Sequence, residues 1–255
     1  MNNYKFEPYV FFLVSFVLLW SFAWLGASRF TRIREQLAQA KEDFRIIEGA
    51  TLTLLALIIG FAFSMALERY DQRKNYEEAE ANAIGTEYAR TDFLPPPAAE
   101  KVRALLLRYL EQRMLFYTTR EADQLATIDK TTTKLQSELW AAVAVPANNN
   151  PTPVMALVVS GMNDVLNSQG YTQAAWWNRI PLAAWAFMFA ISVCATLLVG
   201  IGSKSGMGNG YLLPILPTVI SIAFFLIADI DSTRRGMIRV VPQNLFSLAQ
   251  SLQTP

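Results

Sequence analysis

The chain has 255 residues, 53% of them hydrophobic, and a mean hydropathy of +0.23, values typical of a membrane protein. Its net charge of +1 at pH 7 provides no basic surface for nucleic acid. It has no histidine and one cysteine, Cys194, which excludes an intrachain disulfide, imidazole-based metal sites and histidine-based catalytic triads.

Four apolar runs are each long enough to cross a bilayer as a helix. Such a helix needs roughly 20 apolar residues to span a hydrocarbon core of about 30 Å. The predicted spans are residues 8–27, 50–67, 182–201 and 211–228, and none of them contains Lys or Arg. We interpret the first run as a retained span rather than a signal peptide, because signal peptides have a shorter apolar stretch of about 7–15 residues.

Residues 28–49, between the first two spans, have the pattern of an amphipathic helix. Apolar residues recur there at spacings of three and four, and charged residues occupy the opposite face. Such a helix either lies in the membrane interface or packs on neighbouring helices, and we favour packing. The apolar face consists of Phe30, Ile33, Leu37, Ala40, Phe44 and Ile47.

Residues 68–179 form the only sizeable soluble region, and their pattern predicts helices alone. The second span continues into this region as a charged helix to about residue 93, where a proline run ends it. Further helices are predicted over residues 98–117, 122–143 and 154–168, with "VPANNNPTP" as a loop. The residues expected to face inward are Val102, Leu105, Leu106, Tyr109, Met114, Phe116, Leu125, Ile128, Leu135, Leu139 and Ala142.

The third and fourth spans follow, and residues 229–255 form a C-terminal tail. Trp176 and Trp177 suit a membrane interface, and Pro181 suits the first turn of a helix. Pro214 and Pro217 are expected to bend the fourth span. The glycine-rich link "GIGSKSGMGNG" lacks the spacing of a phosphate-binding loop, so we interpret it as an interhelical turn.

Basic residues near the membrane favour a cytoplasmic soluble region. With four spans, both termini and the soluble region share one side of the membrane. Basic residues are slightly more numerous on that side, as expected for the cytoplasmic face. They are Lys5, Arg69, Arg73, Lys74, Arg179, Arg234, Arg235 and Arg239, against Arg29, Arg32, Arg34, Lys41, Arg45 and Lys204 on the other side.

The stretch "IIGFAFSMALERYDQRKNYEEAEANAIGTEY" passes from apolar to charged without a proline or a turn signal. Copies of such a helix around an axis can form both a membrane pore and its vestibule. Alternatively, the helix is a rigid stalk that joins the membrane to the soluble region. The residues alone leave both interpretations open.

Three segments of the chain resemble the bacterial bestrophin-like membrane proteins, a family distantly similar to the bestrophin ion channels. They are "EGATLTLLALIIGFAFSMALERYD", "EEAEANAIGTEY" and "DIDSTRRGMIRV". In the first segment, Gly60 and Phe61, followed by Arg69 and Tyr70, fit the frame of the second bestrophin helix. The resemblance covers the four spans, the soluble insertion and the tail.

This resemblance implies a pentameric ion channel whose second span lines the pore and whose soluble region is cytoplasmic. The apolar neck of bestrophins corresponds to Thr53, Leu57 and Phe61 here, and rings of apolar side chains can gate a pore by dewetting. Thr53 departs from the family pattern and makes the outer ring more polar. Acidic candidates for the vestibule lining are Glu77, Glu78 and Glu80.

Asp229 and Asp231 lie where the fourth span ends, a region that is also acidic in bestrophins. The calcium clasp of the eukaryotic members needs a larger acidic cluster than these two residues supply. We therefore interpret the two carboxylates, which lie beside Arg234 and Arg235, as part of an ion-pair network. No metal site and no cofactor are predicted.

The sequence thus predicts an all-α, four-span protein of the bacterial inner membrane with a bestrophin-like layout. We favour a homopentameric ion channel whose partners are membrane lipid, other copies of the chain and a permeant inorganic ion of either sign. The alternative is a non-conducting scaffold or sensor whose soluble helical region binds a partner. An enzyme is not expected, because no nucleophile, metal or cofactor constellation occurs in the sequence.

Overall fold

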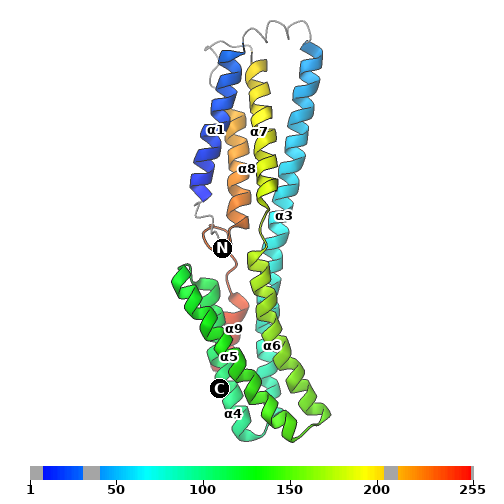
Figure 1. Cartoon of the computed structure of the whole chain (residues 1–255), viewed down its shortest axis with the longest axis vertical. Coiled ribbons are helices and arrows are strands. Elements are labelled where there is room, and N and C mark those ends of the chain that lie inside the picture. The colour runs from blue at the N-terminus through cyan, green and yellow to red at the C-terminus, as the bar shows by residue number, and fades with distance from the viewer. Residues whose placement is uncertain (1–7, 31–40, 204–211, 254–255) are drawn as a thin grey trace. The chain divides into compact units, whose positions relative to one another are not determined.

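The computed structural model describes residues 8–30, 41–203 and 212–253, and these residues form helices without any strand, as predicted (Figure 1). Residues 1–7, 31–40, 204–211 and 254–255 lie outside the described residues. They include ten of the 22 residues of the link helix predicted over 28–49 and most of the turn predicted after the third span. The elements are α1 (Pro8–Arg29), α3 (Lys41–Arg90), η1 (Thr91–Phe93), α4 (Pro96–Thr118), α5 (Ala122–Asn149), α6 (Pro153–Trp177), α7 (Leu182–Gly202), α8 (Ile215–Asp231) and α9 (Gln243–Gln253).

The chain divides into two compact units, and α3 contributes to both of them. The first unit is Met1–Glu68 with Arg179–Ile238, and the second is Arg69–Asn178 with Arg239–Pro255. Among the described residues, three helical stretches are long and apolar enough to cross a membrane: Tyr9–Arg29, Lys41–Phe93 and Pro153–Gly202.

In the first unit, α1 packs against α7 and α8. Gly26 on α1 and Gly200 on α7 allow the two backbones to approach closely. A Cβ atom at Gly200 would overlap the carbonyl oxygen of Ala23, and one at Gly26 would crowd the carbonyl oxygen of Leu197. This small-residue contact is typical of helices that associate within a membrane.

In the second unit, α4 packs against α5 and α9, and α5 packs against α6. One hydrophobic core joins these helices to the second part of α3 and includes most of the residues expected to face inward. Met114 and Leu125 are only partly buried and pack against this core. The period of the apolar residues therefore predicted the buried sides of α4 and α5 correctly.

Three prolines, Pro146, Pro214 and Pro217, do not end or bend helices where the sequence predicted. Helix α5 continues through buried Pro146 to Asn149, so the predicted loop is reduced to a few residues before α6. Helix α6 begins at an N-cap, Thr152, whose hydroxyl accepts a hydrogen bond from the Met155 amide at 3.1 Å.

Pro214 and Pro217 lie at the beginning of α8 rather than inside a bent span. Pro214 is the N-cap, and Pro217 falls in the first turn of the helix. Backbone amides in the first turn have no intrahelical partner, so a proline there removes no hydrogen bond.

Candidate functional site

In the first unit, the two sides of α3 differ sharply in burial. Leu57 and Phe61 have relative exposures of 54% and 67%, whereas Ala62 and Ala66 are at most 4% exposed. Thr53 is also exposed. Thr53, Leu57 and Phe61 follow one another at intervals of four residues, so they share one exposed face of the helix.

The hydroxyl of Thr53 is engaged within the helix itself. Its Oγ1 donates a hydrogen bond to the carbonyl oxygen of Gly49 at 2.8 Å. This bond satisfies the only hydroxyl donor of the side chain, so Thr53 is less polar toward its surroundings than a free hydroxyl group.

The residues that fit the bestrophin frame differ in burial and in the parts of the chain that they contact. Gly60 is exposed, and a Cβ atom there would meet nothing within 4 Å, so packing within one chain does not require a glycine. Arg69 is half-buried, and Tyr70 packs against the hydrophobic core of the second unit.

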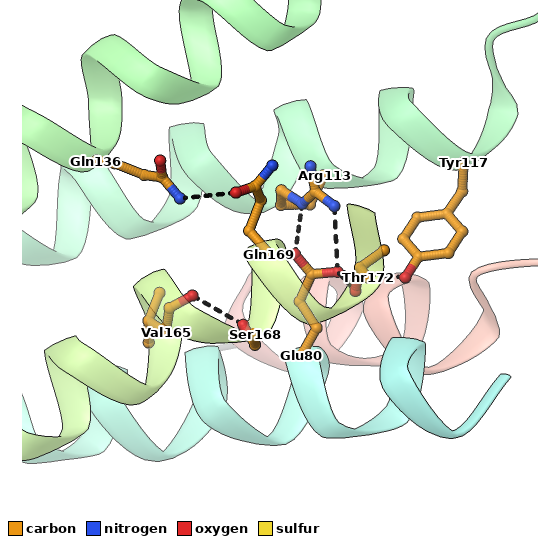
Figure 2. Close-up of polar contacts among 8 residues, drawn as sticks. All are labelled: Glu80, Arg113, Tyr117, Gln136, Val165, Ser168, Gln169 and Thr172. Carbon is orange, nitrogen blue, oxygen red and sulfur yellow. Dashed lines mark hydrogen bonds and ion pairs between the residues drawn. The ribbon is translucent and has the colours of Figure 1, made fainter. Parts of the chain in front are cut away.

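Glu80 lies at the centre of a buried polar network in the second unit (Figure 2). Its carboxylate accepts hydrogen bonds from Nε and Nη2 of Arg113 on α4. The hydroxyls of Tyr117 and Thr172 donate to the same carboxylate at 3.2 and 3.3 Å. The network joins α3 to α4 and α6, and it satisfies a carboxylate that would otherwise be costly to bury.

The electrostatics of this network favour a charged arginine and neutral phenols. Burial alone would lower the pKa of Arg113, but the nearby Glu80 carboxylate raises it, and the net shift is upward. Burial and the charge of Glu80 also raise the pKa of Tyr117. Arg113 and Glu80 therefore form a buried ion pair rather than a neutral pair.

Glu77 is also buried, and it caps the first turn of α9. Its carboxylate accepts a hydrogen bond from the backbone amide of Leu245 at 2.9 Å and one from Nδ2 of Asn244 at 2.6 Å. A carboxylate at this position satisfies an amide that has no intrahelical partner and faces the positive end of the helix dipole. Of the three acidic residues expected to line a vestibule, only Glu78 is exposed.

Glu87 is a buried acid with weaker support. Neither carboxylate oxygen has a hydrogen-bond partner among the described residues, and Nη1 of Arg90 lies 3.9 Å from Oε2. Burial raises the pKa of Glu87 to about 8, with Arg90 lowering it and Asp164 raising it. The absence of a side chain at Gly161 makes room for both Glu87 and Arg90.

Asp229 and Asp231 bind backbone amides of the first unit. The two oxygens of Asp229 accept hydrogen bonds from the amides of Met237 and Ile238 at 2.7 and 2.8 Å. Asp231 accepts from the amide of Ile180 at 3.2 Å. The carboxylates therefore fix the chain around the end of α8, a role that the ion-pair interpretation did not include. The described residues contain no group of three or more side chains suited to hold a metal ion.

Comparison with known proteins identifies the family. The family profile described as "Bestrophin-like domain" matches residues 14–245. A crystal structure of a variant bestrophin homologue from Klebsiella pneumoniae is similar to this chain with a TM-score of 0.65 and 12% sequence identity, covering 98% of each chain. Another structure of a K. pneumoniae homologue, phased on zinc, gives a TM-score of 0.60 and 13% identity, covering 95% of this chain and 99% of that one. None of the curated proteins compared with the chain matches it. The long profile match and the shared fold show that the chain belongs to the bestrophin-like family.

Proposed function

We propose that the chain is a subunit of a homopentameric ion channel in which α3 of each subunit lines the pore. The observation that carries this proposal is the exposed face formed by Thr53, Leu57 and Phe61. Large apolar side chains are exposed there on a helix whose opposite side is buried, so this face is free to meet other copies of the chain. Around an axis, Leu57 and Phe61 would form two apolar rings that can gate by dewetting.

The proposed channel is an integral protein of the bacterial inner membrane with four spans. The spans are those expected from the sequence, and the fourth contains α8, whose 17 residues would extend about 26 Å. The soluble region, both termini and the tail would then be cytoplasmic, with exposed Glu78 available to a vestibule. Lipid would cover the outer faces of the spans.

Two measurements test the proposal. Native mass spectrometry of the detergent-purified protein should give the mass of five subunits. After reconstitution into bilayers, Phe61→Ala or Leu57→Ala should raise the single-channel conductance severalfold, because each change widens an apolar ring.

Phe63→Ala is the matched control, because Phe63 is also exposed but lies about 160° from Phe61 around the helix. Its conductance should stay near that of the wild type. A monomer, or a pentamer in which Phe61→Ala and Phe63→Ala behave alike, would contradict the pore assignment. A monomer would instead favour the scaffold or sensor interpretation.

A further inference from the structure

The exposed face of α3 in the first unit ends at one acidic side chain, Glu68. Glu68 is exposed, and it follows Leu57 by 11 residues and Phe61 by seven. At 3.6 residues per turn, its direction is about 20° from each of these two residues around the helix axis. Ser64, also exposed, shares the same face. Glu68 therefore lies on the face that carries the two proposed rings, about two turns beyond Phe61.

This face has no compensating basic residue. Between Ala50 and Glu68, the only charged residue is Glu68 itself. Arg69 follows directly, but consecutive residues of a helix are about 100° apart, so its side chain leaves the helix in a different direction. Between Ala50 and Glu68 the charge of this face is therefore negative, and Glu68 alone supplies it.

In the second unit, α3 carries a stripe of exposed and mostly polar residues. Asp71, Asn75, Ala79, Asn82 and Thr86 follow one another at intervals of three or four residues, and all of them are exposed. The stripe contains one carboxylate, two carboxamides and a hydroxyl, and no basic side chain. Neither this stripe nor the face between Ala50 and Glu68 carries a basic side chain, and each carries a carboxylate that attracts cations.

We propose that Glu68 determines the sign of the permeant ion and makes the channel select inorganic cations. The inference rests on the proposed function, because it needs α3 to face the axis of a ring of subunits. In such a ring, every subunit would contribute one Glu68, and all of these side chains would lie at the same level of the pore. A ring of carboxylates raises the local concentration of cations and lowers that of anions, as acidic rings do in cation channels.

Reversal potentials test the inference. The purified full-length protein is reconstituted into bilayers of neutral lipid, and currents are recorded under a KCl gradient to obtain the ratio of K⁺ to Cl⁻ permeability. The wild type should prefer K⁺. In Glu68→Gln, the ratio should fall at least fivefold, because a single unit charge about 4 Å from an ion in water already changes the local concentration of that ion about fivefold and the variant removes one charge from every subunit. Glu68→Lys should reverse the preference to Cl⁻.

Glu111→Gln is the matched control, because Glu111 is an exposed acid on α4 and its loss removes the same charge. It should leave the ratio unchanged. Because Glu68 is exposed, both of its variants should assemble, which native mass spectrometry can verify. Currents whose ratio is insensitive to Glu68→Gln and Glu68→Lys would overturn the role of Glu68 and leave the channel proposal intact. A wild-type pentamer that carries no current would overturn the proposed function and the inference with it.

Discussion

Removing Arg113 should strongly destabilise the second unit, because Glu80 would lose its only cationic partner in the network. In Arg113→Met, the carboxylate would keep only the hydroxyl donors of Tyr117 and Thr172. Breaking a buried ion pair from one side costs about 3–5 kcal/mol. For a chain of this size, each kcal/mol lowers the melting temperature by about 2–4 °C. The expected decrease is therefore roughly 6–20 °C.

Intrinsic fluorescence of the detergent-purified protein gives the melting temperature. Trp176 is a suitable reporter of the second unit, because it is buried with ring centroids 5.0 Å from Phe116 and 5.5 Å from Tyr117. Lys134→Met is the matched control. Exposed Lys134 on α5 pairs with Glu138 at 3.7 Å, and a surface pair contributes only about 0–1 kcal/mol, so this variant should melt within about 4 °C of the wild type.

The double variant Glu80→Leu/Arg113→Met separates a lost charge partner from lost packing. Removing both charges leaves no unpaired charge in this network, so the melting temperature should recover much of the decrease seen in Arg113→Met. If Arg113→Met melts no lower than Lys134→Met, or if the double variant melts lower than Arg113→Met, the reasoning from an uncompensated buried carboxylate is refuted.

Glu87 should make stability fall with rising pH, because burial raises its pKa from 4.5 to about 8 in the folded chain. Between these values the folded state holds a proton that the unfolded state has lost, so the free energy of unfolding should fall by about 1.4 kcal/mol per pH unit. Glu87→Gln should lack this slope in melting curves from pH 5 to 8, and equal slopes would refute the assignment. Gly200→Ala should destabilise the contact of α1 with α7 by about 1–3 kcal/mol, because its Cβ overlaps Ala23. Gly170→Ala, with open space around it, should be neutral or stabilising in the same melting assay, and equal behaviour of the two variants would count against the close contact.

The apolar pattern predicted much of the second unit, because burial of apolar residues at helical spacing is what holds α4 and α5 in place. Val102, Leu106 and Leu139 are completely buried, as expected. Local signals were less reliable. The proline and asparagine run after Val143 predicted a loop, yet α5 continues through Pro146, which is itself buried. Burial of that turn outweighs the local preference of its residues.

The acidic residues of α3 show what the sequence could have predicted and what it could not. Arg73, Glu77, Glu80 and Ile84 recur at intervals of three and four, which places them on one side of the helix. By the helical period, that side is opposite to Leu57. Glu77 and Glu80 are therefore not expected on the face of the helix that carries the neck candidates. Their burial could not be predicted, because it depends on Arg113 and Asn244, which lie 33 and 167 residues away in the sequence.

The two sides of α3 therefore have different physical roles. Because of this difference, effects of a substitution on ion conduction can be measured separately from its effects on the stability of the fold. On the buried side of the second unit, Glu77 holds α9 and Glu80 holds α4 and α6. Arg73 adds hydrogen bonds to the carbonyl oxygens of Ala175 and Asn178 at the end of α6, both at 3.3 Å. These contacts fix the rotation of α3 within the unit. Among the residues that the structure describes, the exposed side makes no comparable contacts, so changes at Phe61 or Glu68 should alter conductance or ion preference at nearly unchanged melting temperature. Changes at Glu80 or Arg113 should lower the melting temperature first, and any loss of current should follow from the loss of folded protein.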